Sequence, residues 1–220
     1  MPQPFDQSTY QVRFEWGVAG LRRLAPADVI VVVDVLRFSS TVTDAVASGG
    51  TVDLADAAGW SRNGAAVAAA AASGDATVLL GSLRNAAAVA KTVLEIQNRR
   101  QQRTSVSVIA AGELTGAGEL RFAVEDQLGA GTVIAALSDL GADHTSPEAA
   151  AVCESARGLR RATRHLLSAS GSAKEIAEGV DATARIEAVG LVPTATTAAA
   201  EVDATEVVPV LTEGSFVAFV

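Results

Sequence analysis

The sequence predicts an α/β fold, with a layered sheet of mostly parallel strands and flanking helices. Short β-branched runs alternate along the chain with longer Ala-rich or amphipathic runs. Val29–Val33 is continuously apolar, and Thr77–Leu80 is apolar after its first residue, which is typical of strands covered on both faces. Strands that alternate with helices pair in parallel through right-handed crossovers, so these features together indicate the layered class.

The strands are expected in a regular order along the chain. Period-two alternation predicts the first strand over Gln11–Trp16, and β-branched or apolar composition predicts the others. These others are Val29–Val33, Thr51–Leu54, Thr77–Leu80, Ser105–Ala110, Val207–Leu211 and Ser215–Val220. The last two flank a Glu213-Gly214 turn, which indicates a hairpin.

Helices are expected between these strands. Ala, Leu and charged residues dominate the intervening segments, and these residues favour helix. The expected ranges are 18–24, a helix ending near Ser48, 60–72, 85–99, 124–137, 147–167, and shorter pieces between 173 and 200. A Gly-rich loop is expected from Gly112 to Gly118.

Length and composition limit the class of protein. The 220 residues are compatible with one large domain or two intimately packed lobes, and the lack of a flexible linker leads us to expect one unit over residues 1–220. The net charge of −8 disfavours nucleic-acid binding, and no apolar run approaches the roughly 20 residues that span a membrane. One cysteine and no signal-peptide pattern lead us to expect a cytoplasmic protein.

One segment after a buried strand combines residues suited to anion and metal binding. Asp34 follows Val29–Val33, Arg37 comes three residues later, and Ser39, Ser40 and Thr41 lie at the start of a helix. Asp can hold a hard cation, Arg can clamp a phosphate through two donors, and a helix N-terminus attracts anions. In the alternative interpretation, Asp34 and Ser39 only cap the helix and Arg37 pairs with a surface acid. The spacing alone leaves both interpretations open.

A second acidic pair, Glu125-Asp126, lies near the start of the helix that follows the Gly-rich loop. Acids in a first helical turn are also ordinary partners of the helix dipole, so the pair by itself does not indicate a site. Ligands in α/β folds bind beyond the carboxyl ends of the strands. Ser82 and the loop that starts at Gly112 therefore join Asp34 as candidate positions.

Three common phosphatase designs do not fit the sequence. An aspartyl-phosphate enzyme needs a second Asp two residues after the first, where this chain has Leu36. A cysteine phosphatase needs Cys and Arg closely spaced, whereas Leu159 stands six residues after Cys153. Closely spaced zinc-binding histidines are also missing from a chain with 2 histidines. A carboxylate and Arg site with a hard metal remains, in which water is the candidate nucleophile.

Several segments, in order, resemble the 2-phosphosulfolactate phosphatase family. The leading segment is Val31-Val32-Val33-Asp34-Val35-Leu36-Arg37 followed by Ser/Thr. Four further similar segments cover residues 78–90, 110–113, 122–131 and 201–211. The resemblance therefore extends over most of the chain.

The resemblance implies a Mg²⁺-dependent phosphatase that acts on a small phosphorylated acid and supplies sulfolactate for coenzyme M biosynthesis. It implies that Asp34, Arg37 and Asp126 are catalytic, with Asp34, Glu125 and Asp126 as metal ligands. The implied substrate-binding residues are Ser39, Ser40, Thr41, Ser82, Asn85 and Glu113. No membrane or nucleic-acid partner is expected, and a homodimer is expected from the family and the acidic surface.

The chain departs from the family pattern between its first helix and the Gly81-Ser82 turn. Family members carry a Gly-Glu-Arg, a Gly-Asn-Ser-Pro and a Thr-Thr-Asn-Gly-Thr stretch there, and none is recognisable in Gly50–Thr77. Pro193-Thr194 also replaces a usual acidic pair. We therefore expect a wide, solvent-exposed pocket and low turnover of 2-phosphosulfolactate. The alternative function is a non-catalytic homologue that binds a small phosphorylated or sulfonated anion.

Overall fold

A seven-stranded sheet forms the centre of the computed structural model, which describes residues 3–179 and 181–220. The strands follow the spatial order β1-β5-β2-β4-β8-β9-β3. Their bounds are β1 (Val12–Trp16), β2 (Val29–Val33), β3 (Val52–Asp53), β4 (Thr77–Gly81), β5 (Val106–Ala110), β8 (Pro209–Thr212) and β9 (Ser215–Ala218). β1, β5, β2 and β4 are parallel, and β8, β9 and β3 extend the sheet in antiparallel fashion. The layered α/β class with a mostly parallel sheet is thus confirmed.

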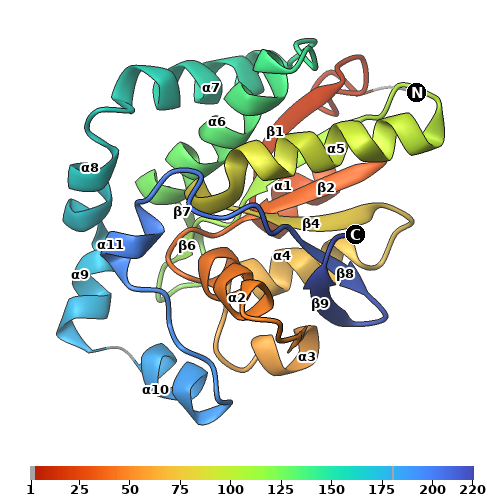
Figure 1. Cartoon of the computed structure of the whole chain (residues 1–220). Helices are drawn as coiled ribbons and strands as arrows, with labels where there is room; N and C mark the ends of the chain where they lie inside the picture. Colours follow the sequence, from red (N-terminus) through yellow and green to blue (C-terminus); the bar gives the residue numbers. More distant parts are fainter. Residues whose placement is uncertain (1–2, 180) are drawn as a thin grey trace.

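Helices cover both faces of the sheet (Figure 1). One face packs against α1 (Gly17–Arg23), α2 (Phe38–Ala47), α3 (Leu54–Ala57) and α4 (Gly64–Ala71), and the other packs against α5 (Ala86–Arg100), α6 (Val124–Asp139) and α7 (Pro147–Leu159). Val29, Val31 and Val33 of β2 face the second group, whereas Ile30 and Val32 face the first. All five residues of β2 are buried, as its unbroken β-branched run predicts.

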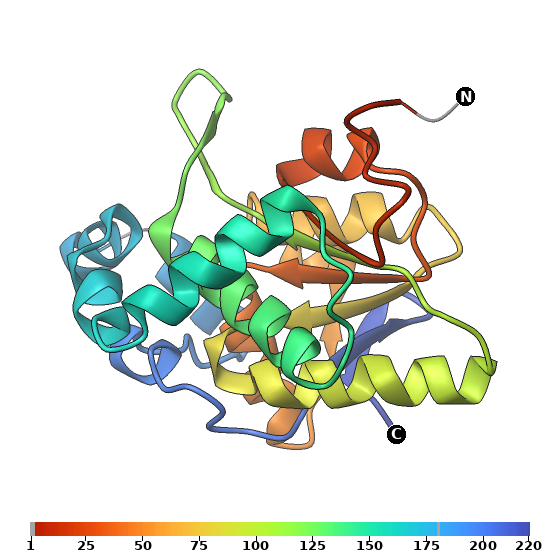
Figure 2. The same cartoon turned by 90° about the horizontal axis from the view of Figure 1, so that it is seen from above.

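Four shorter helices follow α7 and lie beside the end of the sheet to which its parallel strands point (Figure 2). They are α8 (Thr163–Ala169), α9 (Gly171–Glu178), α10 (Asp181–Ala188) and α11 (Thr196–Ala199). Among the residues that the structure describes, none of the helices combines the length and the apolar composition that crossing a membrane requires.

Three expected elements differ from the structure. The helix expected over 147–167 is divided by a turn at residues 160–162, because α8 changes direction to contact α6 and α9. The Gly-rich loop contains a hairpin of β6 (Glu113–Leu114) and β7 (Leu120–Arg121), which projects from the body in Figure 2. The helix expected from Trp60 begins only at Gly64, so that Trp60 and Asn63 lie in an irregular segment before α4.

The connections place a crevice between β2 and β5, which are neighbouring parallel strands. The chain leaves β2 towards α2 on one face of the sheet and leaves β5 towards α6 on the other. Such a switch in direction opens a crevice at the carboxyl ends of the strands, where ligands bind in α/β proteins. The segments that begin with Asp34 and Ala111 border this crevice.

Candidate functional site

Asp34 lies directly after β2 and is held by the starts of two helices. Its Oδ1 accepts a hydrogen bond of 3.1 Å from the backbone N–H of Phe38, the first residue of α2. Its Oδ2 accepts one of 3.0 Å from the N–H of Gly64, the first residue of α4. Asp34 is 7% exposed. Two helix N-termini, each with a partial positive charge, therefore meet at one buried carboxylate.

Asp126 connects the ends of β2 and β5 from the first turn of α6. Its Oδ1 accepts the N–H of Val35 at 2.7 Å, and its Oδ2 accepts the N–H of Gly112 at 2.9 Å. Gly112 has a φ of 68°, and a Cβ there would lie 2.8 Å from a methyl group of Leu120, so glycine is required for both reasons. Asp126 is 3% exposed. This carboxylate fixes the two loops that border the crevice.

Both carboxyl groups resist ionisation. Burial raises the pKa of Asp34 to about 7, assisted by Glu113 and Glu125, although the N–H groups of Phe38 and Gly64 oppose the shift. Burial, followed by the charges of Asp34 and Glu125, also raises the pKa of Asp126 well above its ordinary value. Within residues 3–179 and 181–220, no salt bridge reaches either group. The crevice thus gathers acidic groups that form no salt bridge with any Lys or Arg side chain in the described part of the chain.

Arg37 brings a cation to the same crevice. Its guanidinium donates a hydrogen bond of 2.8 Å to Oγ1 of Thr183 on α10, and Arg37 is 8% exposed. Burial lowers the pKa of Arg37, whereas the nearby charges of Asp34 and Glu187 raise it, and the group stays cationic at neutral pH. A guanidinium has five N–H donors, and one of them binds Thr183. Other donors of Arg37 can therefore bind an anion.

Asp34 and Arg37 line a pocket that we call the carboxylate cleft. Its principal lining residues are Asp34, Arg37, Trp60, Asn63, Glu113 and Glu175. A second pocket shares Glu113, Ser172 and Glu175 with it and reaches Glu125. The two volumes, about 100 and about 170 Å³, suit a small metabolite. Asp34, Arg37, Glu113 and Glu125 therefore border two adjoining pockets, whereas Asp126 is buried and lines neither of them.

The hydroxyl residues that follow Arg37 do not line the carboxylate cleft. Ser39 Oγ donates to the carbonyl of Val32 at 3.1 Å and accepts the N–H of Asp34 at 3.0 Å. Ser40 Oγ donates to the carbonyl of Val35 at 2.9 Å. Both serines are fully buried, so their bonds shape the loop that carries Asp34.

Ser82 and Asn85 also lie outside the carboxylate cleft. They form a reciprocal cap at the short 3₁₀ helix Leu83–Asn85, in which Asn85 Oδ1 accepts the N–H of Ser82 at 2.9 Å. The amide of Asn85 donates to the carbonyls of Leu80 and Val207 at 3.2 and 3.1 Å. These bonds tie β4 to the segment before β8, and the substrate contacts expected of Ser82 and Asn85 stay a prediction.

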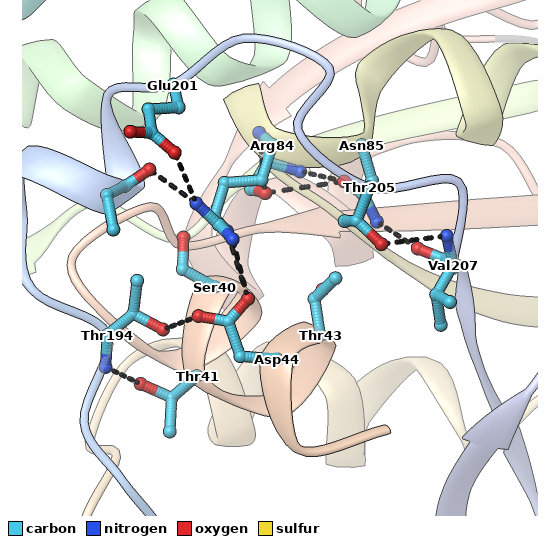
Figure 3. A network of polar contacts seen from close by, with 12 residues as sticks. Ser40, Thr41, Thr43, Asp44, Arg84, Asn85, Thr194, Glu201, Thr205 and Val207 are labelled. Carbon is cyan, nitrogen blue, oxygen red and sulfur yellow. Dashed lines mark hydrogen bonds and ion pairs between the residues drawn. The ribbon is translucent and has the colours of Figure 1, made fainter. Parts of the chain in front are cut away.

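Thr41 belongs to a polar network that holds the C-terminal segment on α2 (Figure 3). Its Oγ1 accepts the N–H of Thr194 at 3.2 Å, and Thr194 Oγ1 donates to Asp44 at 2.6 Å. Arg84 forms a salt bridge of 2.9 Å with Asp44 and donates to the carbonyl of Ala198 at 2.6 Å. Thr194, at the position of the expected acidic pair, is thus engaged with α2.

The expectation of a wide, exposed pocket is wrong. Asp34 and Arg37 are buried because residues 60–64, inside the shortened stretch, cover them from one side. Residues of α9 and α10 cover them from the other, namely Ser172, Glu175, Ile176, Ala182 and Ile186, the last of which is packed into the core. The charges of the carboxylate cleft therefore act in a sheltered environment, where electrostatic interactions are stronger than in water.

The donor set of the carboxylate cleft fits a hard divalent cation. Carboxylate oxygens keep a lone pair after accepting one N–H, and Mg²⁺ is typically bound by one or two carboxylates with several waters. A cation bound beside Asp34 and Asp126 would favour their ionised forms, which burial otherwise disfavours. No group of three His, Cys, Asp or Glu side chains is gathered closely enough for a metal among the described residues. The fit is therefore to a cation that takes few protein ligands.

A comparison with family models identifies the family of the chain. Residues 56–214 match the model described as 2-phosphosulpholactate phosphatase, and this range includes Asn63, Gly112 and Asp126. It starts after Asp34 and Arg37, so their assignment rests on geometry. No curated protein matches the chain. Because the match covers more than half of its 220 residues, the chain belongs to the 2-phosphosulpholactate phosphatase family.

Proposed function

We propose that the protein is a Mg²⁺-dependent phosphatase that hydrolyses a small phosphorylated acid such as 2-phosphosulfolactate to sulfolactate and phosphate. The observation that carries the proposal is that two buried acidic side chains, Asp34 and Asp126, lie near enough to interact electrostatically, with Arg37 near Asp34, at the switch between β2 and β5. Family membership supports the phosphatase class. The sulfolactate product would serve coenzyme M biosynthesis, as the resemblance implies.

The residues take separate roles in this proposal. Asp34, together with Asp126, would hold Mg²⁺, and the nearby charge of Glu125 would add to the attraction; the cation would supply positive charge for the phosphoryl oxygens. Arg37 binds an oxygen of the phosphoryl group through the guanidinium donors that Thr183 leaves free. The N–H groups of Phe38 and Gly64 keep the Asp34 carboxylate in a fixed orientation. Positioned charge of this kind is the main contribution of proteins to phosphoryl transfer.

A second candidate is a non-catalytic homologue that binds a small phosphorylated or sulfonated anion. The lack of a ready group of three metal-binding side chains in residues 3–179 and 181–220 favours this alternative. Arg37 and the sheltered cleft would suffice for anion binding. Turnover separates the two candidates.

The test is phosphate release from a panel of phosphorylated hydroxy acids, measured with Mg²⁺ and with EDTA. Thermal stabilisation by the same compounds is measured in parallel. We expect Mg²⁺-dependent release that is fastest with 2-phosphosulfolactate. Stabilisation without phosphate release would support the binding protein. The absence of both stabilisation and release would contradict both candidates.

A further inference from the structure

Two buried polar atoms, from residues that line the carboxylate cleft, have no hydrogen-bond partner in the part of the chain that the structure describes. They are Nε1 of Trp60 and Oδ1 of Asn63, and both residues line the same pocket as Asp34 and Arg37. Buried polar groups are nearly always paired in folded proteins, because an unpaired one loses its bonds to water without replacement. Two unpaired atoms that belong to residues lining one pocket therefore point to a bound molecule as their partner.

The surroundings fix the orientation of both side chains. Trp60 packs against Phe38, with ring centroids 5.7 Å apart at an interplanar angle of 46°. Asn63 donates from Nδ2 to Oε1 of Glu113 at 2.9 Å, and the same Oε1 also accepts the N–H of Leu114. Because the amide nitrogen of Asn63 donates to a glutamate oxygen, the amide oxygen is the atom left without a partner among the described residues.

The two unpaired atoms have opposite hydrogen-bonding character. Trp60 Nε1 is only a donor, so its partner is an acceptor such as an oxygen of an acid group. Asn63 Oδ1 is only an acceptor, so its partner carries an O–H or N–H. Asn63 is next to Gly64, whose N–H binds Asp34, which brings this pair to the edge of the phosphoryl-binding region.

We propose that Trp60 and Asn63 form a second subsite, which recognises the part of the substrate other than its phosphoryl group. This proposal rests on the proposed function. Trp60 donates to an oxygen of the second acid group, a sulfonate or carboxylate. Hydrolysis breaks the P–O bond, water adds its OH to phosphorus, and its proton ends on the leaving oxygen. The new hydroxyl of the product donates to Oδ1 of Asn63.

Intrinsic fluorescence can test the Trp60 contact directly, because the chain has 2 tryptophans. Trp16→Phe leaves Trp60 as the sole indole, and Trp60→Phe leaves Trp16, which packs with Phe14 and Phe122 and is not part of the carboxylate cleft. Each variant is titrated with sulfolactate and with inorganic phosphate in the presence of Mg²⁺. Phenylalanine preserves the aromatic packing at either position and removes only the indole N–H and ring size.

We expect sulfolactate to change the fluorescence emission of the Trp16→Phe protein and to leave the emission of the Trp60→Phe protein unchanged. Loss of one hydrogen bond in Trp60→Phe should weaken sulfolactate binding by about three- to tenfold. Affinity for inorganic phosphate, measured by competition, should change by less than about twofold, because phosphate contacts the Arg37 region.

The Asn63 contact is tested by comparing sulfolactate with 3-sulfopropionate, which lacks the hydroxyl. The wild-type protein should prefer sulfolactate by about three- to tenfold, and Asn63→Leu should remove that preference. Equal affinity of the wild-type protein for the two compounds would overturn the role of Asn63. This comparison uses the unaltered protein, so it stands even where Asn63→Leu fails to fold.

The outcomes for the subsite and for the proposed function can be told apart. The protein could turn over 2-phosphosulfolactate while sulfolactate leaves the Trp60 fluorescence unchanged and binds Trp60→Phe as tightly as the wild-type protein. That result would overturn the subsite and leave the proposed function standing. A Trp60 response to sulfolactate without any turnover would support the subsite and contradict the phosphatase. No turnover and no response to sulfolactate would overturn both.

Discussion

The backbone N–H of Gly64 donates to Oδ2 of Asp34 at 3.0 Å, and a Cβ on Gly64 would lie 2.6 Å from that same oxygen. The glycine therefore gives the carboxylate both a hydrogen bond and the space it occupies. Phe38 closes the other side, with its ring 2.5 Å from the same Cβ position. The start of α4 is thus fitted to Asp34, although the two residues are 30 positions apart.

Gly64→Ala should displace the start of α4 from Asp34. We expect a loss of about 1–3 kcal/mol in the free energy of unfolding, which is typical of added volume in a packed site, and a loss of Mg²⁺-dependent activity. Urea unfolding and phosphate release measure the two effects. The matched control is Gly74→Ala, because the added Cβ would meet nothing closer than 3.8 Å. Equal stability of the two variants would contradict the close fit at Gly64.

Much of the fold follows from local sequence, as two elements illustrate. The run Val29–Val33 predicts β2 to the residue, since five consecutive β-branched residues suit only a strand buried on both faces. The Glu213-Gly214 turn likewise predicts the hairpin of β8 and β9. Tertiary contacts determine where α4 begins. The Ala-rich composition favours a helix from Trp60, but the hydrogen bond from the N–H of Gly64 to Asp34 places the first turn of the helix at Gly64 instead.

The carboxylate cleft was only partly predictable. Asp34 and Asp126 follow from their places after a strand and at a helix start, because both positions lie at the same edge of the sheet. Local sequence gives no signal for Trp60 and only a weak one for Asn63, since only the fold brings that segment over Asp34. Sequence spacing also could not show that the side-chain amide of Asn85 donates to the carbonyls of Leu80 and Val207. The unusual Asn63-Gly64 dipeptide before an Ala-rich helix was the one available hint.

Asp34→Asn should abolish phosphatase activity and preserve the fold. The amide has the shape of the carboxylate but lacks the charge that would hold Mg²⁺. Circular dichroism should match the wild-type spectrum, while phosphate release falls to background. The control is Asp75→Asn, an exposed residue outside the carboxylate cleft. Undiminished turnover in Asp34→Asn would remove Asp34 from the proposed mechanism.

Arg37→Lys should weaken binding of phosphate and of sulfonates by roughly tenfold. Lysine keeps the charge but cannot reproduce the planar pair of donors, nor reach Thr183 and an anion together. Competitive inhibition of turnover, or thermal shift with inorganic phosphate, gives the affinity. Arg164→Lys changes an exposed arginine of α8 in the same way and should have no effect. An unaltered affinity in Arg37→Lys would argue against the clamp.

Asn85→Ala separates a structural role from substrate binding. The substitution removes the acceptor for the N–H of Ser82 and the donors to Leu80 and Val207. We expect a loss of about 2–3 kcal/mol in the free energy of unfolding, from roughly 1 kcal/mol for each bond, with phosphate affinity unchanged. Asn98→Ala, at an exposed position of α5, is the control. A large fall in phosphate affinity at wild-type stability would instead support the substrate contact expected for Asn85.

The raised pKa of Asp34 has a definite consequence for stability without metal. The folded protein keeps the proton up to about pH 7, whereas the unfolded chain releases it near the ordinary value of 3.8. Between these values the native state binds more protons, so the free energy of unfolding falls as pH rises. The total loss is at most about 4 kcal/mol, and it is complete above pH 7. Asp126 acts in the same direction.

Stability in EDTA should therefore decrease from pH 4 to pH 7, and Asp34→Asn should flatten this dependence because an amide does not titrate. Mg²⁺ binds the ionised carboxylates in competition with protons, so it should raise the melting temperature more at pH 8 than at pH 5.5. Thermal melts of both proteins, with EDTA and with Mg²⁺, measure all four combinations. In Asp34→Asn the Mg²⁺ effect should shrink at both pH values. An equal Mg²⁺ effect in the two proteins would place the cation away from Asp34, while a flat pH dependence of the wild-type protein in EDTA would show that Asp34 is ionised in the free cleft.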